Sequence, residues 1–149
     1  MKRTIFFLLL TLFQQLLFAD ITSPPSPKID NREFPQEELQ KQKNHIAYMV
    51  AQEIKKTLPQ KVDKYTTLVD ISNDKALLIY TFELNVPSKS DAQIIQEDHT
   101  RMQRAITKGV CESSEKFLTA GINTRYIYKS AQSKKELFRF DITRDICKL

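Results

Sequence analysis

The sequence predicts an α+β fold with the element order αββαββ, in which two long helices pack on one face of a four-stranded, mainly antiparallel sheet and one disulfide is formed. Apolar residues recur at helical spacing after residue 36 and again after residue 90, and each such stretch is followed by two stretches in which apolar and polar residues alternate. A helix with one apolar stripe and a sheet with one apolar face must cover each other. The chain also contains two cysteines, enough for one disulfide.

Residues 1–19 have the layout of a secretory signal peptide. Two basic residues precede an apolar run over residues 5–13, and the small residue Ala19 lies just before the first acidic residue. The alternative is an uncleaved membrane anchor. Gln14 and Gln15 interrupt the apolar run well short of the ~20 residues that span a bilayer. We therefore expect cleavage after Ala19 and an exported protein without stable membrane insertion.

Residues 20–35 contain three prolines within four positions, which excludes a helix or a central strand. We expect a proline-rich tether there, with a disordered terminus as the alternative, and a single α+β domain over residues 36–149. Removing the signal peptide lowers the formal net charge from +5 to +3, because two of the 23 basic residues and none of the 18 acidic residues lie in it. So weak and dispersed a charge argues against a nucleic-acid partner.

The first helix is predicted over residues 36–58. Its apolar stripe consists of Leu39, Ile46, Val50 and Ile54, with Ala47, Met49 and Leu58 beside it. Acidic residues in the first turn and lysines in the last turn match the helix dipole. Pro59 ends the helix.

Residues 64–72 and 75–86 alternate with a period of two and predict a hairpin that turns at Asn73 and Asp74. In the second of these strands, one face carries Leu78, Tyr80, Phe82, Leu84 and Val86. The start of the strand is also apolar on its other face, which is typical of a central strand.

The second helix begins at Ser90, which stands in capping-box spacing to Gln93. Its predicted buried stripe is Ile95, Met102, Ile106 and Val110. Gly109 is interpreted as a bend before a short helix, and Gly121 as a left-handed residue that ends it. Residues 122–130 and 136–146 then predict a second hairpin, with one face formed by Phe138, Phe140 and Ile142.

An exported chain with two cysteines is expected to join them in a disulfide, because the compartment is oxidising. A bond between Cys111 and Cys147 closes a loop of roughly 36 residues and stabilises the fold by about 4 kcal/mol. We expect this bond to fasten the last strand at the chain terminus.

The ordered set of "LPQKVDKYTTL", a tyrosine-rich middle, "GVCESSEKFLTAGINTRYIY" and "FDITRDIC" resembles a family of small bacterial exported or membrane-tethered α+β domains. That family has an LPxxVDxxTxL motif and a C-terminal cysteine pair, and the resemblance covers about residues 45–147. It implies an exported α+β domain with a disulfide. Because the family has no established activity, it supplies no catalytic residues.

The motif residues Leu58, Pro59, Val62, Asp63, Thr66 and Leu68 are interpreted as a corner between helix and strand. Leu58 is expected to be the last core contact of the helix and Val62 the first core residue after the turn. Asp63 can accept backbone N–H bonds within the turn. A ligand-binding corner built on Asp63 is the alternative hypothesis.

The sequence offers little catalytic chemistry. His45 and His99 lack cysteine or histidine neighbours at ligand spacing, so we expect neither a metal nor another cofactor. No nucleophile-elbow motif is present, and two glycines leave little provision for a phosphate-binding loop. A small exported hydrolase that uses His45 or His99 with a nearby carboxylate remains the alternative function.

The favoured function is an exported periplasmic or secreted protein-interaction module, such as an adaptor, assembly factor or inhibitor, whose partner is another envelope protein. The candidate interface residues are Tyr65, Arg125, Tyr126 and Tyr128, because tyrosine and arginine are enriched at interfaces. The alternative is that these tyrosines pack under the helices with their hydroxyls at the rim.

Overall fold

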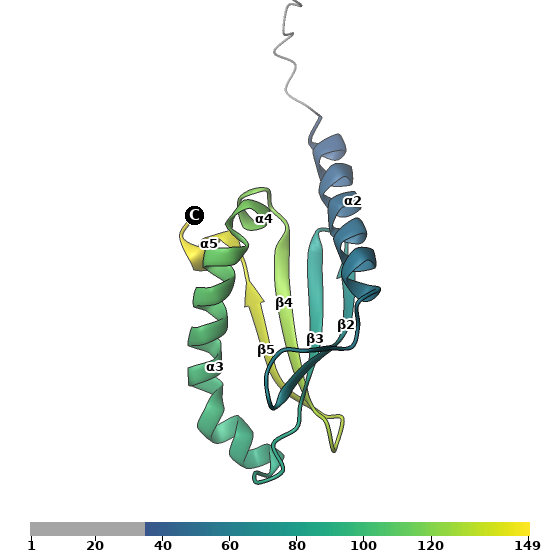
Figure 1. Cartoon of the computed structure of the whole chain (residues 1–149). Helices are drawn as coiled ribbons and strands as arrows, with labels where there is room; N and C mark the ends of the chain where they lie inside the picture. The colour runs from purple at the N-terminus through teal and green to yellow at the C-terminus, as the bar shows by residue number, and fades with distance from the viewer. Residues whose placement is uncertain (1–34) are drawn as a thin grey trace, which may run out of the picture. The chain divides into compact units, whose positions relative to one another are not determined.

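The described residues, 35–149 of a computed structural model, form helices and strands in the order shown in Figure 1. The expected signal peptide (1–19) and all but the last residue of the expected tether (20–35) lie outside them. The first half comprises α2 (Gln36–Lys55), β1 (Gln60–Lys61), β2 (Thr66–Asp74) and β3 (Leu77–Leu84). The second half comprises α3 (Asp91–Ser113), α4 (Glu115–Thr119), β4 (Asn123–Ser130), β5 (Glu136–Ile142) and α5 (Arg144–Cys147).

The five strands form one sheet in the order β1-β2-β3-β4-β5. All neighbours are antiparallel except β3 and β4, which are parallel. A parallel pair needs a long crossover connection, and α3 and α4 supply it. The four long strands match the expected mainly antiparallel sheet, and the two-residue β1 is an addition that the sequence did not predict.

Both long helices cover the same face of the sheet. Helix α2 packs against β2 and β3, and α3 packs against β5. The cluster under α2 contains Leu78, whereas the cluster under α3 contains Phe82, one full strand period further along β3. Because residues four apart on a strand point the same way, the two clusters belong to one apolar face.

Helix α2 differs from its prediction in where it ends and in what it buries. It ends at Lys55 instead of residue 58, because the residue before Pro59 is disfavoured in the helical region. Ala47 and Ala51 are fully buried, whereas Ile46 is 43% exposed. The two alanines let the helix backbone approach the sheet closely, and the larger residues of the predicted stripe are left at its margin.

The first hairpin turns two residues later than predicted. Asn73 and Asp74 remain in β2 and pair with Leu78 and Leu77. The turn begins at Lys75, which adopts a left-handed φ of 52° and whose carbonyl accepts a hydrogen bond from the Asn73 amide at 3.2 Å. The predicted apolar face of β3 is otherwise confirmed, since Leu78, Phe82 and Leu84 are buried.

Helix α3 begins at the predicted capping box, in which Ser90 and Gln93 bond each other's backbone N–H groups. The predicted stripe is wrong at Ile95, which is 42% exposed, because its neighbour Ile94 faces the core instead. Gly109 does not bend the chain, since α3 continues to Ser113. Gly121 has a left-handed φ of 80°, as predicted.

The C-terminus ends in a helical turn and not in a strand. Strand β5 stops at Ile142, and the side chain of Thr143 caps α5 by accepting the N–H of Ile146. Cys147 lies in α5 and is bonded to Cys111 in α3, with 5.4 Å between their Cα atoms. The disulfide therefore fastens a terminal helical turn to α3, whereas the sequence predicted that it fastens the last strand.

Candidate protein-interaction surface

A pocket of about 290 Å³, hereafter the corner pocket, lies between the corner that leads into β2 and the first half of α3. Its apolar lining residues are Leu84, Val86, Ile94 and Met102. Its polar lining residues are Asp63, Lys64, Tyr65, Thr66, Asp98 and Arg101. The pocket thus combines an apolar lining with charged groups of both signs.

Asp63 shapes the corner side of this pocket. Its Oδ1 accepts the backbone N–H groups of Tyr65 at 2.7 Å and Thr66 at 2.9 Å. The hydrogen bond from Tyr65 lowers the pKa of Asp63, because it favours the charged carboxylate. The turn holds Tyr65 at the pocket with 44% of its surface exposed. The corner and the pocket are therefore one construction, in which a structural carboxylate positions an exposed tyrosine.

The other motif residues differ in how deeply they lie. Leu68 and Thr66 are buried, and Leu58 is half-buried against both core clusters. Val62 is 57% exposed, so the prediction that it is the first core residue after the turn is wrong. The chain pairs β1 with β2 at this point, and the N–H of Val62 donates to the Thr66 carbonyl at 2.9 Å, which leaves the Val62 side chain outside the core.

Asp98 and Arg101 form the helical side of the corner pocket. The Arg101 guanidinium donates to Asp98 at 2.8 Å, and Lys89 donates to the same carboxylate at 3.1 Å. The hydrogen bond from Arg101 lowers the pKa of Asp98, which keeps this half-buried carboxylate charged. The Asp98 side chain is 16% exposed but that of Arg101 is 73% exposed. Arg101 thus has donors left for a partner.

The predicted interface tyrosines of β4 belong to an aromatic row on the helix-covered face. Tyr80 stacks on Tyr126 at 5.0 Å and Phe82 on Tyr128 at 4.8 Å between ring centroids. Burial raises the pKa of Tyr128 to about 12 and raises that of Tyr126 further still, so both hydroxyls stay protonated. Tyr128 is only 7% exposed, as the packing alternative anticipated.

Arg125 points to the opposite face of the sheet from the aromatic row. There it forms a two-pronged ion pair with Asp141, at 2.6 and 3.1 Å. The four residues proposed as one interface are therefore separated: Tyr65 lines the corner pocket, Tyr126 and Tyr128 lie under the helices, and Arg125 lies on the far face.

The histidines lack the surroundings that hydrolysis requires. His45 is exposed on α2, and His99 rests against the rings of Phe138 and Phe140 at 5.7 and 5.5 Å. Within residues 35–149, neither histidine pairs with a carboxylate, and no three potential metal ligands gather. None of the helices in this part of the chain is long and apolar enough to cross a membrane.

Sequence reasoning missed the helical side of the corner pocket. Ile94, Asp98 and Met102 follow one another at intervals of four residues, so they share one side of α3. This spacing is visible in the sequence once the capping box fixes where the helix begins. The pairing of that helix side with Tyr65 depends on the fold, since the two segments are some thirty residues apart.

Residues 39–138 match the model of a family described as "Domain of unknown function (DUF8479)". No curated protein is significantly similar to the chain in sequence. Three solved structures share the fold. A protein of Pseudomonas aeruginosa assigned as secreted has a TM-score of 0.64 and 11% identity, covering 73% of this chain and 96% of that one.

Two pilotins of type II secretion systems are also similar in structure. EpsS of Vibrio vulnificus has a TM-score of 0.63 and 16% identity, covering 74% of this chain and 96% of its own. AspS of Vibrio cholerae has a TM-score of 0.57 and 14% identity, covering 75% of this chain and 98% of its own. At these identities the similarities establish a common fold.

Proposed function

This chain belongs to the DUF8479 family, and we propose that it is an exported protein-interaction module that binds another protein of the bacterial envelope through the corner pocket. In this proposal residues 1–19 are a cleaved signal peptide and residues 20–35 a tether, so that the α+β domain works in the periplasm as an adaptor, assembly factor or inhibitor.

The corner pocket carries the proposal. It offers apolar side chains beside an exposed tyrosine and an exposed arginine, and such a combination is typical of the central contacts of protein interfaces. Its volume of about 290 Å³ is at the lower end for small-molecule sites but ample for one large side chain of a partner. No acid–base pair built on a histidine competes with it among the described residues.

The shared fold adds support of a weaker kind. Two of the structurally similar proteins are pilotins of type II secretion systems and a third is assigned as secreted. Since a fold does not by itself fix a function, these proteins make an envelope partner a reasonable choice but do not identify it.

Site-specific photocrosslinking tests the proposal. Tyr65 is replaced in the full chain by the photoreactive analogue p-benzoylphenylalanine, and the cells that produce the protein are irradiated. We expect a covalent adduct with one discrete envelope protein, identified by mass spectrometry. Tyr48, which is 52% exposed on α2 and does not line the corner pocket, carries the same analogue in the matched control.

The adduct should form at position 65 and be absent at position 48. If irradiation gives no adduct at position 65, or the same adduct at both positions, the corner pocket is not the binding site and the proposed function fails.

A further inference from the structure

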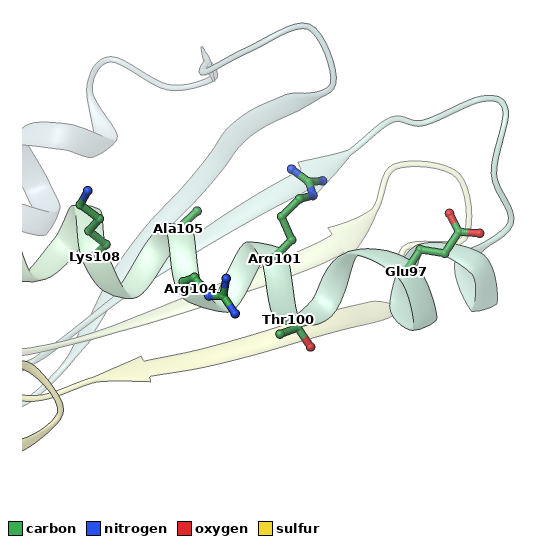
Figure 2. Close-up of a pocket in the computed structure, with 6 residues that line it drawn as sticks. All are labelled: Glu97, Thr100, Arg101, Arg104, Ala105 and Lys108. Atoms are coloured by element: carbon green, nitrogen blue, oxygen red, sulfur yellow. The ribbon is translucent and has the colours of Figure 1, made fainter.

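A series of basic residues, hereafter the basic stripe, leads away from the corner pocket along α3. It consists of Arg101, Arg104 and Lys108, which recur at intervals of three and four residues and are all exposed. They line a hollow along the helix together with Glu97, Thr100 and Ala105 (Figure 2). Arg101 lines both this hollow and the corner pocket, so the two are continuous.

Figure 2 shows how the stripe is presented. Arg101, Ala105 and Lys108 project from one side of α3 and Thr100 from the other. Because Ala105 is small, the two basic side chains on either side of it leave room for a partner to approach the helix. About 10 Å separates Arg101 from Lys108 along the axis, at 1.5 Å per residue.

The positive charge of the stripe is mostly unbalanced. Among the ion pairs within residues 35–149, none includes Arg104 or Lys108. Glu97, which precedes the stripe, is held by Lys89 at 2.8 Å. Glu112 lies one turn beyond Lys108 and limits the stripe at that end. The cations between them are free to pair with carboxylates of a partner.

A second apolar contact lies at the far end of the stripe. Ile146 of α5 is 49% exposed and lines a hollow that also includes Arg104 and Lys108. The disulfide between Cys111 and Cys147 holds α5 against the end of α3, so Ile146 has a fixed place next to the stripe. The surface therefore runs from an apolar pocket, through two to three cations, to an exposed isoleucine.

We propose that the partner contributes an acidic segment with a large apolar side chain at each end. One apolar side chain enters the corner pocket, the carboxylates face the basic stripe, and the second apolar side chain contacts Ile146. This inference rests on the proposed function and names the chemistry of the partner at the same site. An anionic lipid surface fits less well, because Asp63 and Asp98 at the corner pocket repel phosphates and a concave pocket suits a single side chain.

Charge reversal of the stripe tests the inference. The variant Arg104→Glu/Lys108→Glu is compared with Lys116→Glu/Lys135→Glu, which makes the same change of net charge at exposed lysines outside these pockets. The probes are a synthetic peptide with glutamates between two leucines, the same peptide with glutamines, and vesicles of phosphatidylglycerol or phosphatidylcholine. Circular dichroism and thermal melting verify that each variant is folded.

The native chain should bind the glutamate peptide more tightly than the glutamine peptide, and added salt should weaken that binding. We expect reversal of the stripe to reduce the affinity for the glutamate peptide by about tenfold or more, and the control reversal to leave it within about twofold. Equal binding of the two peptides, an unchanged affinity in the stripe variant, or binding to phosphatidylglycerol vesicles without binding to the peptide would each overturn the inference.

The photocrosslink at position 65 separates the two proposals. If the native chain gives the adduct and the stripe variant gives it in equal yield, the partner does not use the basic stripe, and the inference fails while the proposed function stands. If the native chain gives no adduct, the proposed function itself fails.

Discussion

The two αββ halves of this domain have the same order of elements but hold their long helices in different ways. Helix α2 is fixed to the first hairpin by the close approach of two buried alanines, Ala47 and Ala51. Helix α3 is fixed to the second half by a capping box, by larger residues such as Ile94 and Val110, and by the disulfide. Packing of small side chains tolerates no added volume, whereas a covalent bond tolerates none of its partners being removed. Each helix should therefore fail under a different change.

The largest effect is expected at the small-residue contact of α2. Replacing Ala51 by Asp places an unpaired carboxylate at a position that is 1% exposed, which should destabilise the domain by about 3–5 kcal/mol. That cost is comparable with the whole stability of many domains of this size. Chemical denaturation of the folded fraction, followed by circular dichroism, measures it.

The matched control is Ile46→Asp on the same helix. Because Ile46 is 43% exposed, its replacement should cost less than about 1 kcal/mol. If both aspartates were equally harmful, the alanines would not be what fixes α2, and the contrast between the halves would be lost.

The next largest effect is expected from removing the disulfide. Cys111→Ser, Cys147→Ser and the double variant should be destabilised by similar amounts, about 2–5 kcal/mol, because loss of either sulfur removes the whole bond. Hydrogen exchange should increase first in α5 and at the end of α3, and α2 should remain protected.

Reduction of the native protein provides a second measurement of the same comparison. Dithiothreitol should reproduce the exchange pattern of the serine variants without affecting the Ala51 contact. Faster exchange in α2 than in α5 after reduction would show that the disulfide supports both halves, contrary to this account.

The smallest effect concerns the two carboxylates of the corner pocket, one from each half. Asp63 and Asp98 both have lowered pKa values in the folded state, so each contributes stability above the pKa of an unfolded aspartate, and that stability is lost as the pH falls through the folded pKa. Below about pH 4, Asp63→Asn and Asp98→Asn should each lose stability less steeply than the native chain.

Salt distinguishes these two carboxylates. The pKa of Asp63 is lowered mainly by a backbone N–H group and that of Asp98 mainly by the Arg101 side chain. Because salt screens exposed charges, about 1 M NaCl should flatten the acid dependence of the Asp98 contribution and leave that of Asp63 nearly unchanged. Urea titrations across this pH range at low and high salt measure both, and an equal salt response would contradict the assignment of causes.

Part of the candidate site could be predicted from the sequence. The motif placed Asp63 in a turn, and the structure shows its carboxylate bonded to two backbone N–H groups there. Tyr65 was among the candidate interface residues, and it lines the pocket. Arg101 and Met102 were not predicted as site residues, because nothing local indicates that their side of α3 faces the corner.

The sequence by itself determined what depends on neighbours a few residues apart. The capping box at Ser90, the left-handed Gly121 and the apolar face of β3 all follow from hydrogen bonds and alternation within short stretches, and all are present. The order of helices and strands follows from the same local patterns, although the start of α5 was taken for strand.

Tertiary structure alone decided which apolar residues were buried and which surfaces met. Alanine was preferred to isoleucine inside α2 because the distance between helix and sheet, which no local pattern contains, left room only for a methyl group. Strands β3 and β4 became parallel neighbours because α3 crosses between them. The same crossover brings residues 94–102 beside residues 63–66, and so the corner pocket exists only in the folded chain.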